Sequence, residues 1–261
     1  MCQSKDEGGR RCPDGRRFMK SSFTTADLVP QQVPGRPSIK WRSESLDAVK
    51  EQWPTSYVCA TCKTLERHSA AEPQVTDAME RALPPNAHLE GLEYRMKSPA
   101  SICGKIDRKQ QDAVDLGADV PTAEAVAGRM KDVLRYTFVT ADHDSVTDAV
   151  THVAAQLSRD GWTITEAENM FVSGNSYKGL HLTATNSDSL SVEVQIHSQE
   201  SIDTKNQIHK LYEEMRDTGT SPARRRELHD EMVSLSDALS TPRGLEKLTT
   251  LEDCEVREIK R

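Results

Sequence analysis

The chain has 261 residues and a formal net charge of −7, with 36% hydrophobic and 5% aromatic residues. This length allows one sizeable domain with appendages, and the low apolar content argues against two large cores. No apolar run is long enough to span a membrane, and no signal-peptide core follows the basic start. We therefore expect a cytoplasmic protein with no membrane partner.

The charge is unevenly distributed along the chain. Residues 1–42 carry nine Lys or Arg and four Asp or Glu, a net of +5, which leaves −12 on the remainder. This stretch is rich in Gly, Pro, Arg and Ser, a composition typical of a flexible arm. A basic arm could contact RNA or another phosphate-rich partner. A solvated tail without a partner is the alternative, and we favour it.

Six cysteines are scattered without a regular disulfide framework, so reduced thiols are expected. Cys59 and Cys62 have the spacing of a metal knuckle, and together with Cys2 and Cys12 they could complete a four-thiolate zinc site. Scattered free thiols are the alternative, and we favour it, because nothing in the sequence confirms that the four cysteines come together.

Between residues 43 and 171 the pattern predicts alternating helices and strands. The expected elements are helices over 47–53 and 75–83, a strand over 88–97, a helix from Ser98, a polar insertion over 107–120, a helix from Thr122, a strand over 133–139, an amphipathic helix over 144–159 and a strand over 163–171.

The stretch from Tyr177 to His197 predicts a β-hairpin with one apolar and one polar face. Its core-facing residues are Leu180, Leu182, Ala184, Leu190, Val192, Val194 and Ile196. With a turn over 186–188, the register places His181 near Glu193 and Gly179 near Gln195. Gly179 is then expected to leave room for a flat ligand on the polar face.

A helix follows the hairpin, and Lys205, His209 and Tyr212 share one of its faces. Another helix is expected over 223–239, and residues 246–261 are expected to form a C-terminal tail. A carboxylate, an amide, imidazoles, an amine and phenols can thus converge, as chemistry on a phosphorylated nucleotide requires. An ordinary solvated strand face is the alternative. There is no Walker P-loop, so phosphate binding has to come from Lys, Arg and Mg²⁺.

Five short motifs in order resemble one known family. They are EYRMKSPASICGKI, KDVLRYTFV, YKGLH, EVQIHS and HKLY, which together fall within residues 91–213. This set resembles the synthetase domain of RelA/SpoT-like proteins. The resemblance implies an α+β fold, a mixed β-sheet flanked by helices, over residues 43–245. It also implies a Mg²⁺-dependent pyrophosphokinase that transfers pyrophosphate from ATP to a ribose 3′-OH.

The resemblance also assigns roles to individual residues. Asp132 and Glu193 match the acidic positions that hold Mg²⁺ and serve as general base. Tyr177 matches the tyrosine that stacks on the acceptor base. The positions matched to ATP phosphates are Arg95, Lys97 and Lys105, and those matched to the border of the acceptor site are Gln195 and His209. Arg135 is added as a further ATP-binding candidate, and His181 and Lys205 are added as acceptor-binding candidates.

The chain departs from the family pattern at three positions. Arg135 comes three residues after Asp132 instead of five, so on a regular strand the two face opposite ways. His197 replaces an arginine, which weakens phosphate binding unless the imidazole is charged. Ser176 replaces a glycine. These departures indicate a divergent branch with an altered acceptor or lost activity.

Three functional hypotheses follow from these observations. The first is a transferase acting on a guanine nucleotide, an adenine nucleotide or tRNA. Since no hydrolase module accompanies it, a growth-inhibiting toxin with an antitoxin or immunity protein as partner is plausible. The second is a degenerate module that binds a nucleotide or RNA, and the third is a structural partner protein. The sequence does not name the acceptor or predict an oligomeric state.

Overall fold

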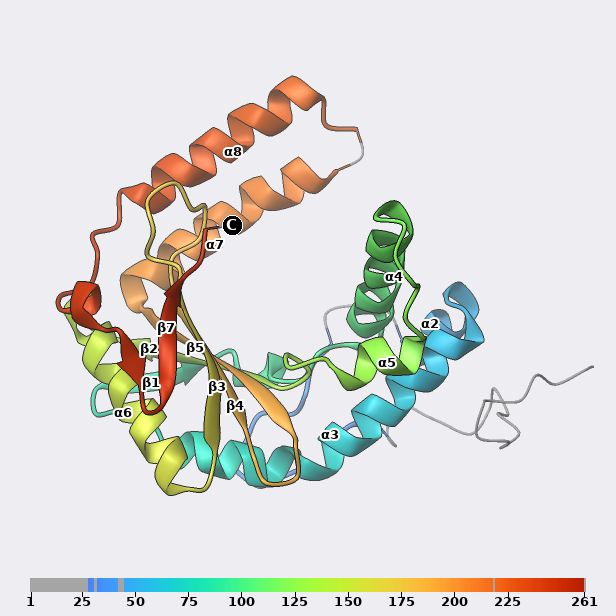
Figure 1. Cartoon of the computed structure of the whole chain (residues 1–261), viewed down its shortest axis with the longest axis horizontal. Coiled ribbons are helices and arrows are strands. Elements are labelled where there is room, and N and C mark those ends of the chain that lie inside the picture. The colour runs from blue at the N-terminus through green and yellow to red at the C-terminus, as the bar shows by residue number, and fades with distance from the viewer. Residues whose placement is uncertain (1–27, 31, 42–44, 218, 261) are drawn as a thin grey trace, which may run out of the picture. The chain divides into compact units, whose positions relative to one another are not determined.

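The computed structural model describes residues 28–30, 32–41, 45–217 and 219–260. Two compact units are present (Figure 1). One contains Met96–Val133 and the described residues up to Pro73, and the other contains Gln74–Arg95 and Leu134–Arg261. Each unit is described by itself below.

The first unit is helical. Its elements are α2 (Leu46–Gln52), the first part of α3 (Thr55–Arg81), α4 (Pro99–Asp115) and α5 (Ala123–Gly128). Hydroxyl side chains cap three of these helices, because Ser45, Ser98 and Thr122 each accept a backbone N–H three residues further on. The sequence predicted α2 and the start of α5 correctly.

Two helices are longer than predicted. α4 continues through the expected polar insertion, because Ile102, Cys103 and Ile106 anchor its first turns in the core and its polar remainder extends into solvent. α3 begins 20 residues before the expected start at Val75. Its extra turns bury Val58, Cys62 and Leu65 at helical spacing and then continue through Pro73.

The second unit contains a seven-stranded mixed sheet in the order β1-β2-β5-β4-β3-β7-β6. Its strands are β1 (Ala87–Glu90), β2 (Arg135–Thr140), β3 (Thr163–Asn169), β4 (Leu180–Thr185), β5 (Ser191–Ser198), β6 (Thr250–Leu251) and β7 (Cys254–Glu258). The β2–β5 and β3–β7 pairs are parallel, and the others are antiparallel. The predicted α+β class with a mixed sheet is confirmed.

The strand predicted over 88–97 ends early. Gly91 adopts a left-handed conformation with φ +62°, and a 3₁₀ turn, Leu92–Tyr94, follows it. Glycine tolerates this backbone without strain, so it stops the strand here. Arg95 and Lys97 therefore lie outside β1, although the sequence predicted a strand that continues to residue 97.

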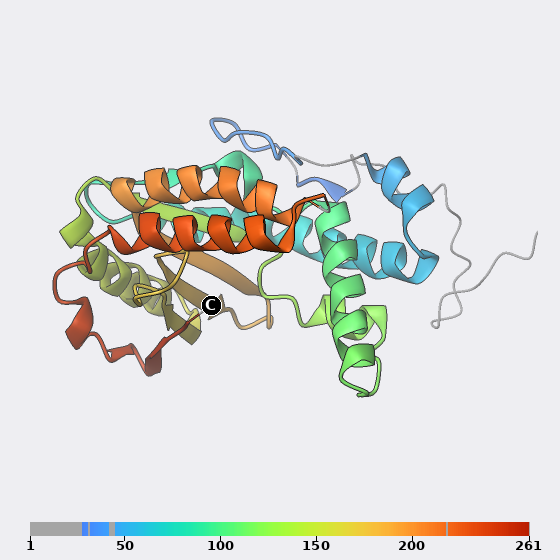
Figure 2. The ribbon, with the colours of Figure 1, turned by 90° about the horizontal axis from the view of Figure 1, so that it is seen from above.

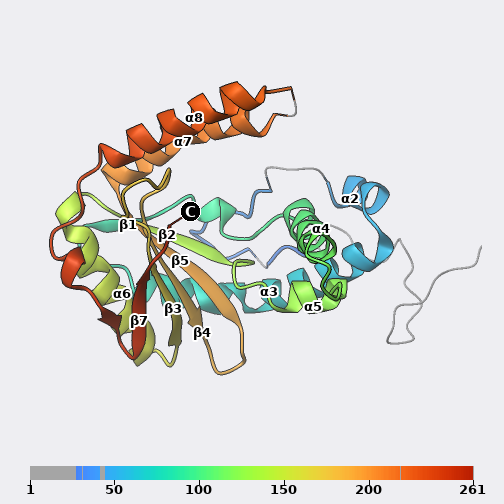
Figure 3. The same cartoon turned by 45° about the horizontal axis from the view of Figure 1, so that its top comes forward.

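Helices lie on both sides of the sheet (Figures 1 and 3). They are α6 (Val146–Arg159), α7 (Gln199–Arg216) and α8 (Pro222–Asp237). α6 presents its apolar stripe to β3 and β5, whereas α7 contacts β2 and β5 from the other side. α7 and α8 run side by side (Figure 2). Among the described residues, no helix has both the length and the apolarity to cross a bilayer.

The segment expected as a C-terminal tail instead completes the sheet. β7 pairs parallel with β3, and the Ile259 amide donates to the Asn169 carbonyl at 2.9 Å. Leu251 is only 3% exposed, so burial of this side chain favours the strand over a solvated tail. The weak alternation of this short, charged stretch hid the strand from sequence inspection.

Candidate functional site

One face of the sheet is polar, as the alternation predicted. All seven residues expected to face the core are at most 3% exposed. On the opposite face, β2 and β5 place Arg135 beside Glu193 and Thr137 beside Gln195. β4 places His181 on the other side of Gln195. Side chains from three strands therefore gather around β5.

The predicted register of the hairpin is wrong by two residues. His181 lies opposite Gln195, and Thr183 lies opposite Glu193. The cause is the connecting loop, which spans residues 186–190 instead of 186–188. The Asn186 side chain closes this loop by accepting from the amides of Asp188 and Leu190. Since the shift is an even number, each side chain keeps its predicted face.

The Glu193 carboxylate is held by two donors on the same oxygen. Arg135 Nε lies 2.9 Å from Oε1, and Gln195 Nε2 donates to the same atom at 2.5 Å. The Glu193 side chain is 18% exposed, so part of it remains accessible from solvent. Arg135 thus pairs with the proposed base, a role that the sequence did not suggest.

Lys205 reaches from α7 to the same face of the sheet. Its Nζ donates to Gln195 Oε1 at 3.2 Å and lies 5.6 Å from the centroid of the Tyr177 ring. Burial and the neighbouring Arg135 lower the pKa of Lys205 to about 8, although Glu193 and Glu90 act in the opposite direction. Glu193, Gln195, Lys205 and Tyr177 therefore form a continuous group, which we call the acceptor cluster.

Tyr177 lies in the loop before β4 and is bonded to two imidazoles. Its hydroxyl is 2.7 Å from His181 Nε2 and 2.6 Å from His197 Nε2. The side chains of Tyr177 and His197 therefore fill the space above Gly179. The prediction that this space is open to a flat ligand is wrong. A Cβ at Gly179 would lie 2.7 Å from His197 Cε1 and 2.9 Å from the Tyr177 hydroxyl.

His197 is not a phosphate-binding cation. Its side chain is fully buried, and burial together with Lys205 and His181 lowers its pKa well below the ordinary value. The imidazole is therefore neutral at neutral pH. The charge lost with the family's arginine is not restored here.

Sequence inspection missed the contacts that hold the loop carrying Tyr177. Asp237, at the end of α8, accepts from Lys178 Nζ at 2.7 Å and from the Gly174 amide at 2.9 Å. Only 4% of the Lys178 side chain is exposed. These partners are about 60 residues apart in the chain, so no local pattern signals their contact.

A second cluster lies in the helical unit. Asp132 Oδ2 is 2.7 Å from Lys97 Nζ, and Asp132 Oδ1 is 2.8 Å from Lys105 Nζ. Both amines were predicted to bind phosphate, and we call this group the lysine cluster. Arg95 is only 5% exposed, and its guanidinium donates to the Leu92 carbonyl at 2.7 Å. Its expected role in ATP binding stays a prediction.

The ion pairs of Asp132 in the lysine cluster should make the folding stability of the protein depend on pH. Burial alone would raise the pKa of Asp132, but Lys97 and Lys105 outweigh it and hold that pKa well below 3.8. A carboxyl with a depressed folded-state pKa stabilises the fold above its unfolded-state pKa, and this contribution is lost as the pH falls. We expect the melting temperature to drop as the pH is lowered from 5 toward 2. In Asp132→Asn this part of the drop should disappear, and an unchanged acid profile would contradict the ion pairs.

Two further predicted sites have different outcomes. His209 projects from α7 with 58% of its side chain exposed and lies 3.8 Å from Glu213. Cys59 and Cys62 are buried in α3, and burial raises the pKa of Cys62 to about 11. The other two proposed zinc ligands, Cys2 and Cys12, lie outside the described residues, so the zinc site stays a prediction.

The carboxylates fit a Mg²⁺ ion that arrives with its substrate. Among the described residues, no group of three or more His, Cys, Asp or Glu side chains could form a metal cage. Mg²⁺ commonly binds through one or two carboxylates plus substrate phosphates and water, so a cage is not needed. In the lysine cluster Asp132 would supply a carboxylate and the amines would contact the phosphates. In the acceptor cluster Glu193 would supply a carboxylate.

Comparison with known proteins finds similarity among solved structures alone. No family model and no curated protein matches the chain. A solved complex between the Type VI effector Tas1 and its immunity protein shows 19% identity over 71% of this chain and 96% of that chain, with a TM-score of 0.38. The small alarmone synthetase 1 from Bacillus subtilis shows 18% identity over 70% and 87%, with a TM-score of 0.43.

The same Bacillus subtilis enzyme bound to its product pppGpp shows 15% identity over 74% of this chain and 91% of that chain, with a TM-score of 0.43. The chain is thus similar in structure to small alarmone synthetases and to Tas1. These similarities concern the fold and are distant. The functional proposal below therefore rests on the side chains of this chain.

Proposed function

We propose that the protein is a pyrophosphokinase that transfers the β,γ-pyrophosphate of ATP to a ribose 3′-OH of a nucleotide or of tRNA. The observation that carries this proposal is the acceptor cluster. It combines a partly accessible carboxylate and an amide from β5 with the ammonium group of Lys205 from α7 and the half-buried Tyr177 from the loop before β4. The motif resemblance assigns three of these residues, Glu193, Tyr177 and Gln195, to catalysis and acceptor binding.

Each residue type suits its proposed role. Glu193 accepts the proton of the acceptor hydroxyl through Oε2, since the donors described above engage Oε1. The Tyr177 ring stacks on the acceptor base. Lys97 and Lys105 contact the ATP phosphates as charge-assisted donors. Mg²⁺, when bound with ATP, would neutralise phosphate charge as the bond breaks.

The proposed reaction forms one bond and breaks one. The acceptor 3′-oxygen attacks the β-phosphorus of ATP, the bond from that phosphorus to the bridging α–β oxygen breaks, and AMP leaves. The proton of the 3′-OH passes to Glu193. Arg135 and Gln195 fix the carboxylate in place, which favours a productive geometry.

Removal of the Tyr177 ring should impair acceptor use selectively. Base stacking is worth about 1–3 kcal/mol, so Tyr177→Ala should weaken acceptor use by roughly ten- to a hundredfold. Affinity for ATP should barely change. Steady-state kinetics over an acceptor series and ATP titration would check this. If ATP binding collapses and the melting temperature falls sharply, Tyr177 is a structural residue and its acceptor role is wrong.

A non-catalytic module that binds nucleotide or RNA is the alternative. The neutral, buried His197 favours it, because this position has lost a cation. Detection of AMP release with label transfer from ATP would exclude this alternative. A toxin role, with an immunity protein as partner, is a further part of the proposal. Growth arrest on induction of the wild-type chain, but not of Glu193→Gln, would support it.

A further inference from the structure

His197 contacts Tyr177 but is fully buried, so its part in the site needs an explanation. We propose that His197 is a positioning residue that acts through Tyr177, holding the phenol so that its ring is preset for the acceptor base. His197 does not itself touch the substrate. This inference rests on the proposed acceptor role of Tyr177.

The hydrogen-bond pattern fixes the tautomer of His197. Ser201 Oγ lies 3.1 Å from the Ser198 carbonyl and 3.0 Å from the Ser198 amide. A carbonyl only accepts and an amide N–H only donates, so the Ser201 hydroxyl hydrogen goes to the carbonyl. His197 Nδ1, at 2.9 Å from Ser201 Oγ, must then be the donor to that oxygen.

This assignment sets the direction of the bonds at Tyr177. With Nδ1 protonated and the ring neutral, His197 Nε2 is an acceptor, and the Tyr177 hydroxyl donates to it. The Tyr177 oxygen accepts in turn from His181 Nε2. One chain of bonds therefore runs from His181 through Tyr177 and His197 to Ser201, and each hydrogen in it has one acceptor.

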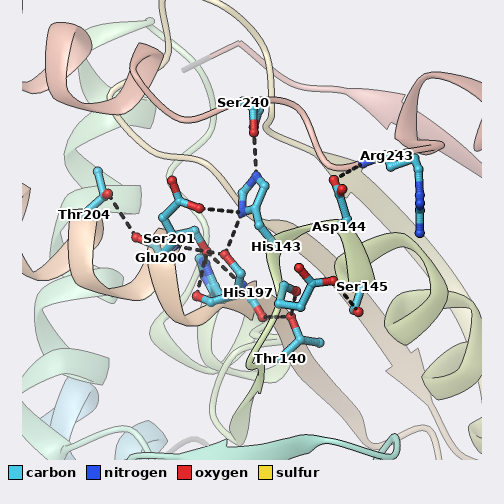
Figure 4. A network of polar contacts seen from close by, with 12 residues as sticks. Thr140, His143, Asp144, Ser145, His197, Glu200, Ser201, Thr204, Ser240 and Arg243 are labelled. Carbon is cyan, nitrogen blue, oxygen red and sulfur yellow. Dashed lines mark hydrogen bonds and ion pairs between the residues drawn. The ribbon is translucent and has the colours of Figure 1, made fainter.

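The end of this chain is fixed to the fold. Ser198 and Ser201 form the capping box of α7, so the acceptor for His197 belongs to a helix start. His143, in the turn that follows β2, contacts the same helix start, since its Nδ1 lies 2.7 Å from Ser198 Oγ. Its Nε2 donates to the Ser240 carbonyl at 2.9 Å (Figure 4).

The rings also restrict each other sterically. The Tyr177 ring meets His181 and His197 edge to face, at centroid distances of 5.3 and 5.4 Å. Gly179 makes this possible, because a Cβ there would collide with His197 and Tyr177. A ring fixed before binding loses little entropy when a base stacks on it. Tyr177 is thus preorganised before an acceptor base arrives.

A double-mutant cycle tests whether His197 acts only through the Tyr177 hydroxyl. His197→Leu and Tyr177→Phe would be combined, and the affinities for ADP and GDP measured by calorimetry. We expect His197→Leu alone to weaken binding of the better nucleotide by roughly two- to tenfold, the range for one lost hydrogen bond. In the Tyr177→Phe background the same change should have almost no further effect. Equal losses in both backgrounds would overturn the proposal.

Two further measurements separate positioning from stability and from the proposed function. His197→Gln offers an amide oxygen to Tyr177 and should recover most of the lost affinity, which a general loss of stability would not allow. Without nucleotide, the fluorine NMR signal of 3-fluorotyrosine at Tyr177, assigned with Tyr177→Phe, should change in His197→Leu. An unchanged signal would overturn the positioning role. A changed signal in a protein that binds neither nucleotide nor tRNA would refute only the acceptor role of Tyr177.

Discussion

Glu193→Gln is expected to abolish most of the transfer activity while the fold and ATP binding persist. A neutral amide cannot take the proton from the acceptor hydroxyl, and loss of a positioned general base typically costs about 10²–10⁴ in rate. Gln has nearly the same size as Glu, so packing on β5 should survive. The turnover rate should fall, and the KM for ATP should change little.

The matched control for this variant is Glu255→Gln. Glu255 lies on β7 with 72% of its side chain exposed, next to Arg257 and away from the acceptor cluster. The same chemical change there should leave transfer at the wild-type rate. Transfer by Glu193→Gln at a rate close to that of wild type would refute the proposed base.

The second large effect concerns the lysine cluster. Lys97→Met combined with Lys105→Met should weaken binding of ATP·Mg²⁺ by about a hundredfold or more, because each charge-assisted hydrogen bond is worth about 1.5–3 kcal/mol. Both changes are made in an Asp132→Asn background, since the buried carboxylate would otherwise lose both counterions. Asp132→Asn alone is the reference for the hundredfold loss, because Asp132 is itself a proposed Mg²⁺ ligand. Calorimetric titration without any acceptor isolates this donor step.

The control for the lysine cluster removes two charges from the same helix. Arg108→Met with Lys109→Met changes exposed side chains of α4 and should leave ATP affinity intact. A parallel titration with tRNA distinguishes the two uses of these lysines. Unchanged ATP affinity, together with lost and strongly salt-dependent tRNA binding, would indicate an RNA surface and remove the donor site.

The parts of the fold set by strict periodicity were predictable from the sequence. The apolar faces of β4 and β5 and the stripe of α6 follow directly from periods of 2 and 3.6 residues. The register of the hairpin was not predictable, because the Asn186 side chain closes a five-residue loop that resembles a three-residue loop in sequence. β7 was missed because its pairing partner, β3, is distant in the chain.

The residue types of the candidate site were predictable, but their contacts were not. Short motifs identified Glu193 and Tyr177, and helical spacing identified Lys205; the structure brings all three together. The bonds of His197 to Tyr177 and Ser201 depend on ring orientation and on the absence of a side chain at Gly179. Spacing alone cannot specify such geometry, so His197 could only be noted as a replaced arginine.

The most direct test of the central claim is label transfer from γ-³²P-ATP. Purified protein would be incubated with Mg²⁺ and separately with GDP, GTP, ADP, ATP and bulk tRNA. We expect label to appear on one acceptor class with one AMP released per transfer, and Glu193→Gln to show neither product. Binding of ATP without AMP release or labelled product for any of these acceptors would refute the proposed transfer.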